Sequence, residues 1–393
     1  MEITIIAADL SINSIARSYT LGMALRKKYK VKIIGFRSGE KVWPPADTGD
    51  FNYFDVPLKL MPFSISQTNK LLKEMTGDVI YAHKPLSASF GVGLIKKLSS
   101  NVPVVLDIED WDLGFRLQDG KNKSIFKKAK TVLMKTKNTA SLFVHNPYSQ
   151  IQSSVWFFEK LIPFADHITV SNRFLQRKFG GTIVRHGRNM SFFNPGRFDN
   201  AGIRKKEGLR DSFKVSFIGT PRGHKGLGML TDAVSKIPNK NITLFIVSLK
   251  RNASTEHLRE KCIEKLGADR VEFLYINDFE SIPKYSTVAD LIVIPSEQSP
   301  SNIGQLPVKL FDALAMAKPI ISTDISDAAE ILEGCGWIVE PDNPEALAEQ
   351  IQYIYDHPKE AKEMGKKARE KCMKNYSWEA IGEVLSEIFD KYK

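Results

Sequence analysis

Short apolar runs alternate with amphipathic segments along almost the whole chain. In the first half the apolar runs lie at residues 3–8, 31–36, 53–56, 79–82, 102–106, 167–170 and 182–184. In the second half they lie at residues 214–219, 243–247, 271–275, 291–295, 320–323 and 337–339. Runs of this kind are typical of strands that are buried on both faces, and the segments between them have helical periodicity. The pattern predicts doubly wound α/β structure with parallel sheets.

The length of the chain favours two such domains. It has 393 residues, of which 42% are hydrophobic, and single cores rarely grow beyond about 250–300 residues. No apolar run approaches the roughly 18 residues of a membrane-spanning helix. The chain opens directly into an apolar strand, without the basic start and cleavage site of a signal peptide, so we expect a cytoplasmic protein. Its scattered cysteines predict reduced thiols, neither a disulfide framework nor a metal site: Cys262, Cys335 and Cys372.

Residues 293–323 combine a strand, a polar loop, a helix and a second strand. Pro307 suits the first turn of the helix, because its missing N–H would be unpaired there. Lys309 and Asp312 share a helix face near the positive end of the helix. A lysine beside unpaired backbone N–H groups can bind phosphate, and a carboxylate one turn on can bind the two hydroxyls of a ribose. The alternative is an exposed ion pair between the two side chains, which would contribute little.

Charged residues also follow two other predicted strands. The strand that ends at Gly219 leads into a basic turn with Arg222 and Lys225, and glycines there allow the backbone to approach a ligand closely. Alone, such a turn is a weak signal. The strand at residues 102–106 leads into a group of carboxylates, which are costly to gather unless they have a purpose or serve as solvated caps: Asp107, Glu109, Asp110 and Asp112.

The helix at Pro307 resembles the donor-binding signature of the family 4 retaining glycosyltransferases, which have the GT-B fold. The matching residues are Pro307, Lys309, Leu310, Asp312, Ala313, Ala315 and Pro319. The resemblance implies two Rossmann-like doubly wound domains facing a cleft. It implies an acceptor-side domain at residues 1–188, a linker at 189–213 and a nucleotide-sugar-binding domain at 214–375. The C-terminal helix at residues 376–393 is expected to cross back to the first domain.

In the second domain the resemblance implies a diphosphate clamp made of three cations, Arg222, Lys225 and Lys309. Asp312 is expected to bind the ribose. Relatives carry another acidic residue eight positions earlier, which binds the sugar; this chain has Gly304 there, so the neighbouring Gln305 is the expected substitute. Two residues on the adjoining loops are also expected to contact the substrate: Gly219 and Asn302.

In the first domain relatives have a glycine-rich turn after the first strand. This chain offers Asn13 and Ser14 there as hydrogen-bonding groups, with a simple helix cap as the alternative. The carboxylate group resembles a D-x-H-D-type segment that lines the reaction cleft, with Glu109 in place of the histidine. Glu109 or Asp110 is expected to accept the proton of an incoming hydroxyl or to hold the acceptor.

The implied activity is the transfer of a hexose or a related sugar from a UDP- or GDP-sugar to a lipid-linked or cell-envelope glycan acceptor. Because cations already balance the leaving diphosphate, we expect neither a metal site nor a cofactor. A sugar-nucleotide epimerase or a phosphorylase can share the fold. The missing acidic residue also leaves open a binding protein without catalytic activity.

The net charge of +11 is concentrated in a basic segment. Residues 121–137 contain lysines and no acid, interspersed with apolar residues. Such a surface can bind anionic lipid, which predicts peripheral attachment to the inner face of the cell membrane. The alternatives are a solvated helix face and nucleic-acid binding, for which no motif is present. The expected membrane-binding residues are Phe126, Lys127, Lys128, Lys130 and Lys135.

Overall fold

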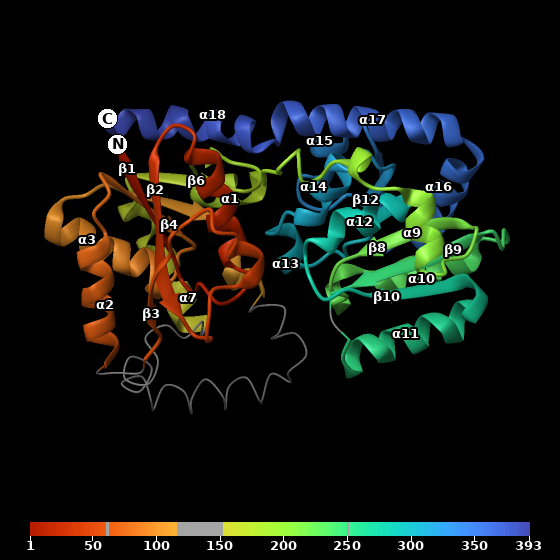
Figure 1. Ribbon diagram of the computed structural model, residues 1–393, viewed down its shortest axis with the longest axis horizontal. Coiled ribbons are helices and arrows are strands. Elements are labelled where there is room, and N and C mark those ends of the chain that lie inside the picture. The colour runs from red at the N-terminus through yellow and green to blue at the C-terminus, as the bar shows by residue number, and fades with distance from the viewer. Residues whose placement is uncertain (60–62, 116–151, 250) are drawn as a thin grey trace. The chain divides into compact units, whose positions relative to one another are not determined.

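The computed structural model describes residues 1–59, 63–115, 152–249 and 251–393. The chain forms two compact units (Figure 1). The first unit consists of Met1–His186 together with Ile381–Lys393, and the second of Gly187–Ala380. The C-terminal segment therefore belongs to the same unit as the N-terminus.

The described part of the first unit holds one parallel sheet of seven strands. Their order across the sheet is β3-β2-β1-β4-β5-β6-β7. The register of β1 and β2 runs from Glu2 opposite Lys30 to Ala7 opposite Gly35. The strands are β1 (Glu2–Ala7), β2 (Lys30–Arg37), β3 (Phe54–Pro57), β4 (Val79–His83), β5 (Val104–Ile108), β6 (His167–Val170) and β7 (Thr182–Ile183).

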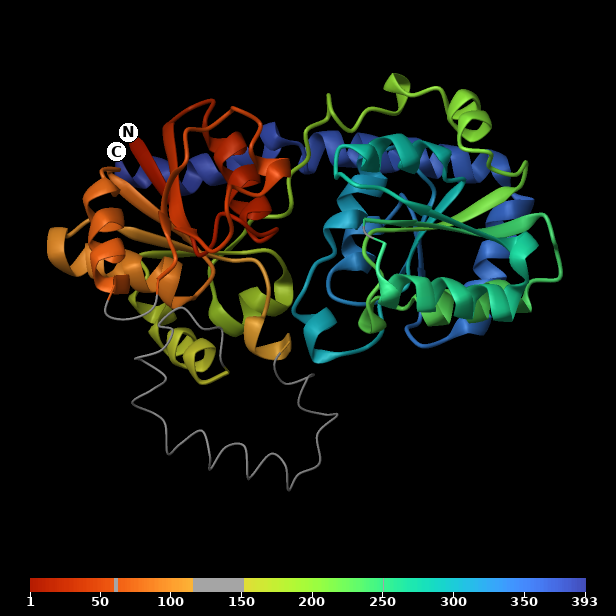
Figure 2. The same cartoon turned by 60° about the horizontal axis from the view of Figure 1, so that its bottom comes forward.

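Helices cover both faces of this sheet (Figure 2). One face packs against α1 (Ile15–Leu25) and α18 (Trp378–Phe389). The other face packs against α2 (Phe63–Glu74), α3 (Val92–Ser100), α7 (Gln152–Leu161) and α8 (Arg173–Phe179). The central strands are buried because both of their faces are covered, which explains their continuous apolar sequences.

The C-terminal helix α18 completes the first core. Ile381, Leu385 and Phe389 are buried among residues of α1 and the sheet. The Phe389 ring lies with its centroid 5.1 Å from that of Tyr81. Beyond the helix, Lys28 donates a hydrogen bond of 2.6 Å to the carboxylate of Asp390. The end of the chain is therefore fixed to the first unit by both apolar and polar contacts.

The described part of the second unit also holds one parallel sheet, with six strands in the order β10-β9-β8-β11-β12-β13. The strands are β8 (Phe213–Ile218), β9 (Ile242–Ser248), β10 (Val271–Tyr275), β11 (Leu291–Ile294), β12 (Ile320–Thr323) and β13 (Trp337–Val339). One face packs against α10 (Leu227–Lys236), α11 (Ala253–Leu266) and α16 (Pro344–Asp356). The other packs against α12 (Ser281–Val288), α14 (Val308–Ala315), α15 (Ala328–Leu332) and α17 (Pro358–Asn375).

Residues 189–213, which we expected to be a linker, are part of the second unit. They contain the helix α9 (Asn200–Lys206). Met190, Phe193 and Ile203 pack against the core on the α14 side of the sheet. The segment is polar on average, but these apolar side chains attach it to the unit that follows it.

Replacing Phe389 with alanine should destabilise the first unit. A fully buried phenylalanine leaves a cavity when it is truncated, which costs about 3–5 kcal/mol, and Phe389 is 0% exposed. Urea-induced unfolding followed by circular dichroism measures the loss. Leu98→Ala in α3 is the control, because Leu98 is 88% exposed. A loss for Phe389→Ala no larger than that for Leu98→Ala would contradict the packing described for α18.

Candidate functional site

In the second unit the predicted site residues gather where the sheet changes direction. β8 and β11 are neighbours, with β9 and β10 on one side and β12 and β13 on the other. The loops that follow β8 and β11 therefore start side by side and diverge, an arrangement in which ligands bind in open parallel sheets. Gly219, Arg222 and Lys225 follow β8. Asn302, in the short helix α13 (Pro300–Ile303), and Gln305 follow β11, and Lys309 and Asp312 lie on α14 directly afterwards.

The two loops are held together by backbone contacts. Gly226 has a φ of 71°, and a Cβ at this position would lie 1.6 Å from the carbonyl oxygen of Pro295. The Asn302 side-chain amide donates to the carbonyl oxygens of His224 at 2.6 Å and Glu297 at 2.8 Å. We predicted a substrate contact for Asn302. In the structure its amide nitrogen fixes the loops, a role that the sequence does not reveal.

Lys225 and Lys309 form the charged centre of this site. Lys225 Nζ donates to the Oε1 atom of Gln305. Lys309 Nζ lies 4.0 Å from the centroid of the Phe217 ring, and the described residues provide no ion-pair partner for it. Burial, and secondarily the charge of Lys225, lower the pKa of Lys309 to about 7. A lysine with such a shift beside a second cation is typical of a site that binds an anion.

Gly219 and Arg222 lie at the start of the same loop. Gly219 follows β8 with a φ of 121°, a conformation that favours glycine, and a Cβ there would meet no described atom within 4 Å. Arg222 is exposed, and its carbonyl oxygen accepts a hydrogen bond of 2.9 Å from the Lys225 N–H. Of the three predicted cations, the structure brings Lys225 and Lys309 together and leaves the side chain of Arg222 at the surface of the loop.

Asp312 pairs with Arg188, a residue that the sequence analysis missed. Arg188 Nε donates to Asp312 Oδ1 at 2.5 Å, and Arg188 Nη2 donates to the carbonyl oxygen of Val308 at 2.9 Å. Burial raises the pKa of Asp312, while the guanidinium of Arg188 opposes that rise. The sequence left open an ion pair between Lys309 and Asp312. In the structure Asp312 pairs with Arg188 instead.

In the first unit most of the clustered carboxylates are neutralised by buried cations. Arg17 Nη2 lies 2.9 Å from Asp107 Oδ1, and both side chains are fully buried. Lys84 donates to Asp110 at 3.0 Å and to Asp112 at 3.2 Å. Lys84 has a φ of 69°, an uncommon conformation for a residue other than glycine. Asp110, a predicted catalytic residue, is thus part of an ion-pair cluster.

Glu109 lies beside two histidines instead. Its Oε2 atom is 3.3 Å from His83 Nε2, and its Oε1 atom is 4.0 Å from His186 Nδ1. The two imidazoles come from the end of β4 and the end of the first unit's main segment. A carboxylate next to imidazoles can accept and position a hydroxyl, so the structure distinguishes Glu109 from Asp110.

The loop after β1 is shaped by a carboxylate. Asp9 Oδ1 accepts from the Ser11 N–H at 2.9 Å, and Ser11 Oγ accepts from the Gly39 N–H at 2.8 Å. Asn13 is exposed. Ser14 occupies the N-cap position of α1, but its side chain makes no capping hydrogen bond. The substrate contacts expected of Asn13 and Ser14 stay predictions.

The expected membrane-binding residues lie outside the described residues: Phe126, Lys127, Lys128, Lys130 and Lys135. Of the helices that the structure describes, none is both long and apolar enough to cross a bilayer. Nor does the described part of the chain contain a group of three or more His, Cys, Asp or Glu side chains able to hold a metal ion.

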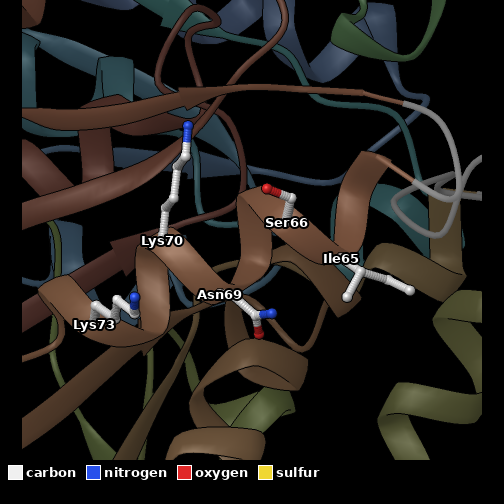
Figure 3. A pocket seen from close by; sticks show the side chains of 5 residues that line it. All are labelled: Ile65, Ser66, Asn69, Lys70 and Lys73. Carbon is white, nitrogen blue, oxygen red and sulfur yellow. The ribbon is translucent and has the colours of Figure 1, made fainter.

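A surface hollow lies along α2, away from the predicted residues. It is lined by side chains of this one helix, which do not converge on a common point (Figure 3). The lining residues are Ile65, Ser66, Asn69, Lys70 and Lys73. Since it lies on a helix face and not at the ends of strands, it adds nothing to the site of the second unit.

Comparison with known proteins shows what the chain is similar to. Residues 212–357 match the family described as Glycosyl transferases group 1. Spore coat protein SA of Bacillus subtilis is 24% identical over 270 residues, which cover 64% of this chain and 70% of that protein. The GDP-mannose-dependent monoacylated alpha-(1-6)-phosphatidylinositol monomannoside mannosyltransferase of Corynebacterium glutamicum is 24% identical over 261 residues, 61% of this chain and 66% of that enzyme. Anabaena HepE in complex with UDP-glucose aligns with a TM-score of 0.75 at 16% identity, over 100% of each chain.

The two doubly wound sheets have the fold of the GT-B glycosyltransferases. Within the second unit, residues 212–357 are similar to the group 1 glycosyltransferases. The predicted fold is thereby confirmed, and the family match together with the curated relatives supports the predicted group. The narrower assignment to family 4 stays a prediction.

Replacing Gly226 with alanine should disrupt the loop that carries Lys225. The new methyl group would collide with the Pro295 carbonyl at a backbone angle that disfavours alanine. We expect a lower melting temperature and at least tenfold weaker binding of inorganic pyrophosphate, measured by calorimetry. Gly228→Ala is the control, because a Cβ there meets nothing within 4 Å, and alanine favours the helix by up to about 1 kcal/mol. Equal melting temperatures and equal pyrophosphate affinities of the two variants would contradict the close approach of Gly226 to the Pro295 carbonyl.

Replacing Lys309 with methionine should stabilise the protein in a pH-dependent way. Below a pH of about 7 the lysine is charged in both the folded and the unfolded chain, so the full cost of burying the charge is present. Between about 7 and the ordinary value of 10.5 only the unfolded chain stays charged, and that cost disappears as the pH rises. The gain in melting temperature should therefore be largest at pH 6–7 and vanish near pH 10.5.

Thermal unfolding at several pH values measures this gain. Lys366→Met is the matched control, because the Lys366 side chain is 58% exposed and its loss should not change the melting temperature. A gain for Lys309→Met that is absent at pH 6 or that grows with pH would show that Lys309 is not a buried cation.

Proposed function

We propose that this chain transfers a sugar from a nucleotide sugar to a glycan acceptor with retention of the anomeric configuration. The observation that carries the proposal is the pair of Lys225 and Lys309 at the switch point of the second sheet, with Lys309 half-buried and its pKa lowered. Two cations held in proximity repel each other until an anion binds beside them. A nucleoside diphosphate supplies that anion. Similarity to a GDP-mannose-dependent enzyme and to a structure that contains UDP-glucose supports a nucleotide-sugar donor.

Departure of the nucleoside diphosphate would be the step that this site assists. Negative charge grows on the leaving phosphate, and positioned cations stabilise it. Lys225 and Lys309 are held by the loops after β8 and β11, and Arg222 on the same loop would add a third charge. Lys309 would take up a proton as the diphosphate binds, because the anion favours its charged form. No step of this scheme calls for a metal ion.

Asp312 would bind the ribose hydroxyls, since Arg188 holds only its Oδ1 atom in the hydrogen bonds of the described residues. The sugar itself would meet Gln305, whose side chain is positioned by Lys225. A neutral amide at this place differs from the acidic residue of the family pattern. We propose that Gln305 orients the sugar by hydrogen bonds without adding negative charge near the leaving group.

Glu109 would position the acceptor hydroxyl in the first unit. In a retaining transfer from the leaving-group side, the departing phosphate oxygen takes the hydroxyl proton as the new glycosidic bond forms. Glu109, held between His83 and His186, would accept a hydrogen bond from that hydroxyl and orient it. A separate general base is then unnecessary.

The acceptor is proposed to be a lipid-linked or cell-envelope glycan. Related proteins are named as a D-rhamnosyltransferase of Pseudomonas aeruginosa and a putative teichuronic acid biosynthesis glycosyltransferase of Bacillus subtilis. The lysines of residues 121–137 would bring the protein to the inner face of the cell membrane by attraction to anionic lipid.

Removing a cation of the clamp should lower turnover. A thermal-shift panel of UDP- and GDP-sugars identifies the donor, and transfer to a glycan acceptor is then assayed. Lys309→Met and Arg222→Ala should each reduce turnover by about 10²-fold, equivalent to about 3 kcal/mol of lost charge stabilisation. Lys366→Met serves as the control. Interconversion of the donor without an acceptor would identify an epimerase instead, and tight binding without any transfer would identify a binding protein.

Neutralising the basic segment should release the protein from membranes. Changing Lys127, Lys128, Lys130 and Lys135 to glutamine should abolish most co-sedimentation with anionic vesicles at low salt. Binding by the unmodified protein should weaken with salt, since the Debye length falls from about 10 Å at 0.1 M to about 3 Å at 1 M. Transfer to a soluble acceptor should be preserved. Equal sedimentation of both proteins, or of neither, would leave these lysines as a solvated face.

A further inference from the structure

Arg188 makes three hydrogen bonds with its side chain, and two of them reach one helix. Besides its bonds to Asp312 and to the Val308 carbonyl, its Nη1 donates to the carbonyl oxygen of Gly187 at 2.7 Å. The residue is 7% exposed, and its guanidinium carbon lies 5.6 Å from the centroid of the Phe193 ring. The planar group is therefore held in one orientation against the first turn of α14.

The backbone of Arg188 is equally constrained. Its N–H donates to the carbonyl oxygen of Tyr376 at 2.8 Å, and its own carbonyl accepts from the Trp378 N–H at 3.0 Å. These bonds form an isolated parallel bridge to Ser377. Both backbone polar groups are bonded to residues where α17 ends and α18 begins, so the Cα atom of Arg188, from which the side chain extends, is held within the second unit.

Asp312 depends on such a partner. Its carboxylate is largely buried, with 13% of the side chain exposed. The described hydrogen bonds and ion pairs use only its Oδ1 atom, so Oδ2 keeps its capacity to accept from a ligand. Arg188 is not among the residues that carry the family resemblance, so the resemblance assigns it no role.

We propose that Arg188 is a positioning residue that fixes the carboxylate of Asp312 for the ribose of the nucleotide. The inference rests on the proposed function, because it takes Asp312 to be a ribose ligand. Arginine is suited to this role, since its fork binds the carboxylate and the Val308 carbonyl together, which a lysine cannot reproduce. Arg188 itself need not touch the nucleotide.

Two ligands separate positioning from a merely structural role. Inorganic pyrophosphate tests the lysine site alone, while UDP and GDP also require the ribose contact. Arg188→Met should weaken binding of the preferred nucleoside diphosphate at least tenfold, a loss of about 1.4 kcal/mol or more in binding free energy. It should leave pyrophosphate affinity within about twofold. With the sugar nucleotide as substrate, KM should rise more than kcat falls. Arg188→Lys should recover only part of the affinity.

Arg204→Met is the matched control. Arg204 also pairs with an aspartate, Asp290, and with the carbonyl oxygens of Val288 and Ser212 in the same unit, but it lies apart from α14 in sequence and contacts. It should lower the melting temperature and leave both affinities unchanged. In a double-mutant cycle, Asp312→Asn should have a much smaller effect on nucleotide binding in the Arg188→Met background than alone.

These measurements distinguish failure of the positioning role of Arg188 from failure of the proposed function. Equal loss of pyrophosphate and nucleotide binding in Arg188→Met, or no loss of either, would overturn the positioning role. Additive effects of Arg188→Met and Asp312→Asn would also overturn it. If the unmodified protein bound neither pyrophosphate nor any nucleoside diphosphate, the proposed function would fail instead. Should Arg188→Met not fold, Arg188→Lys and Asp312→Asn carry the same comparison.

Discussion

The close approach of Gly226 to the Pro295 carbonyl is the constraint on which the site of the second unit depends. It brings the backbones of the loops after β8 and β11 into direct contact, and the Asn302 side chain donates hydrogen bonds to both loops. Lys225 and Gln305 come from different loops and meet because of this contact. The positive charges are thus positioned by folding, before any ligand binds. Such preorganisation is what allows charge to stabilise a transition state without further rearrangement.

Lys309 differs from the buried charges that are paired in both units, such as Arg17 with Asp107 and Arg188 with Asp312. In the first unit Arg17 and Lys84 neutralise carboxylates at short distance, as buried ions require. In the second unit Lys309 lies against an aromatic ring without a carboxylate among the described residues. A buried cation that pairs with a carboxylate of the protein is typical of a structural ion pair. A buried cation without such a partner can bind an anionic ligand. This difference supports the proposed anion site beside Lys309.

The sequence predicted the parallel sheets well, because buried strands leave a simple apolar pattern. It also identified Lys309 and Asp312 as candidates, since both lie close together on one helix with a family resemblance. It did not find the partners of these residues. Arg188 is 124 positions from Asp312, and His83 is 26 positions from Glu109, so neither pairing has a local signal. The same limit explains the linker prediction: polarity along residues 189–213 concealed a few apolar side chains that pack against a distant core.

Lys84 shows how conformation and charge can restrict one position at once. Its left-handed backbone would suit glycine best, but glycine would leave Asp110 and Asp112 facing each other without a cation. Asparagine tolerates the same backbone and is equally neutral. The residue can therefore be lost in evolution only if the acids are lost with it. An alignment of close homologues should show covariation of these three positions, with Lys or Arg retained wherever both carboxylates are present.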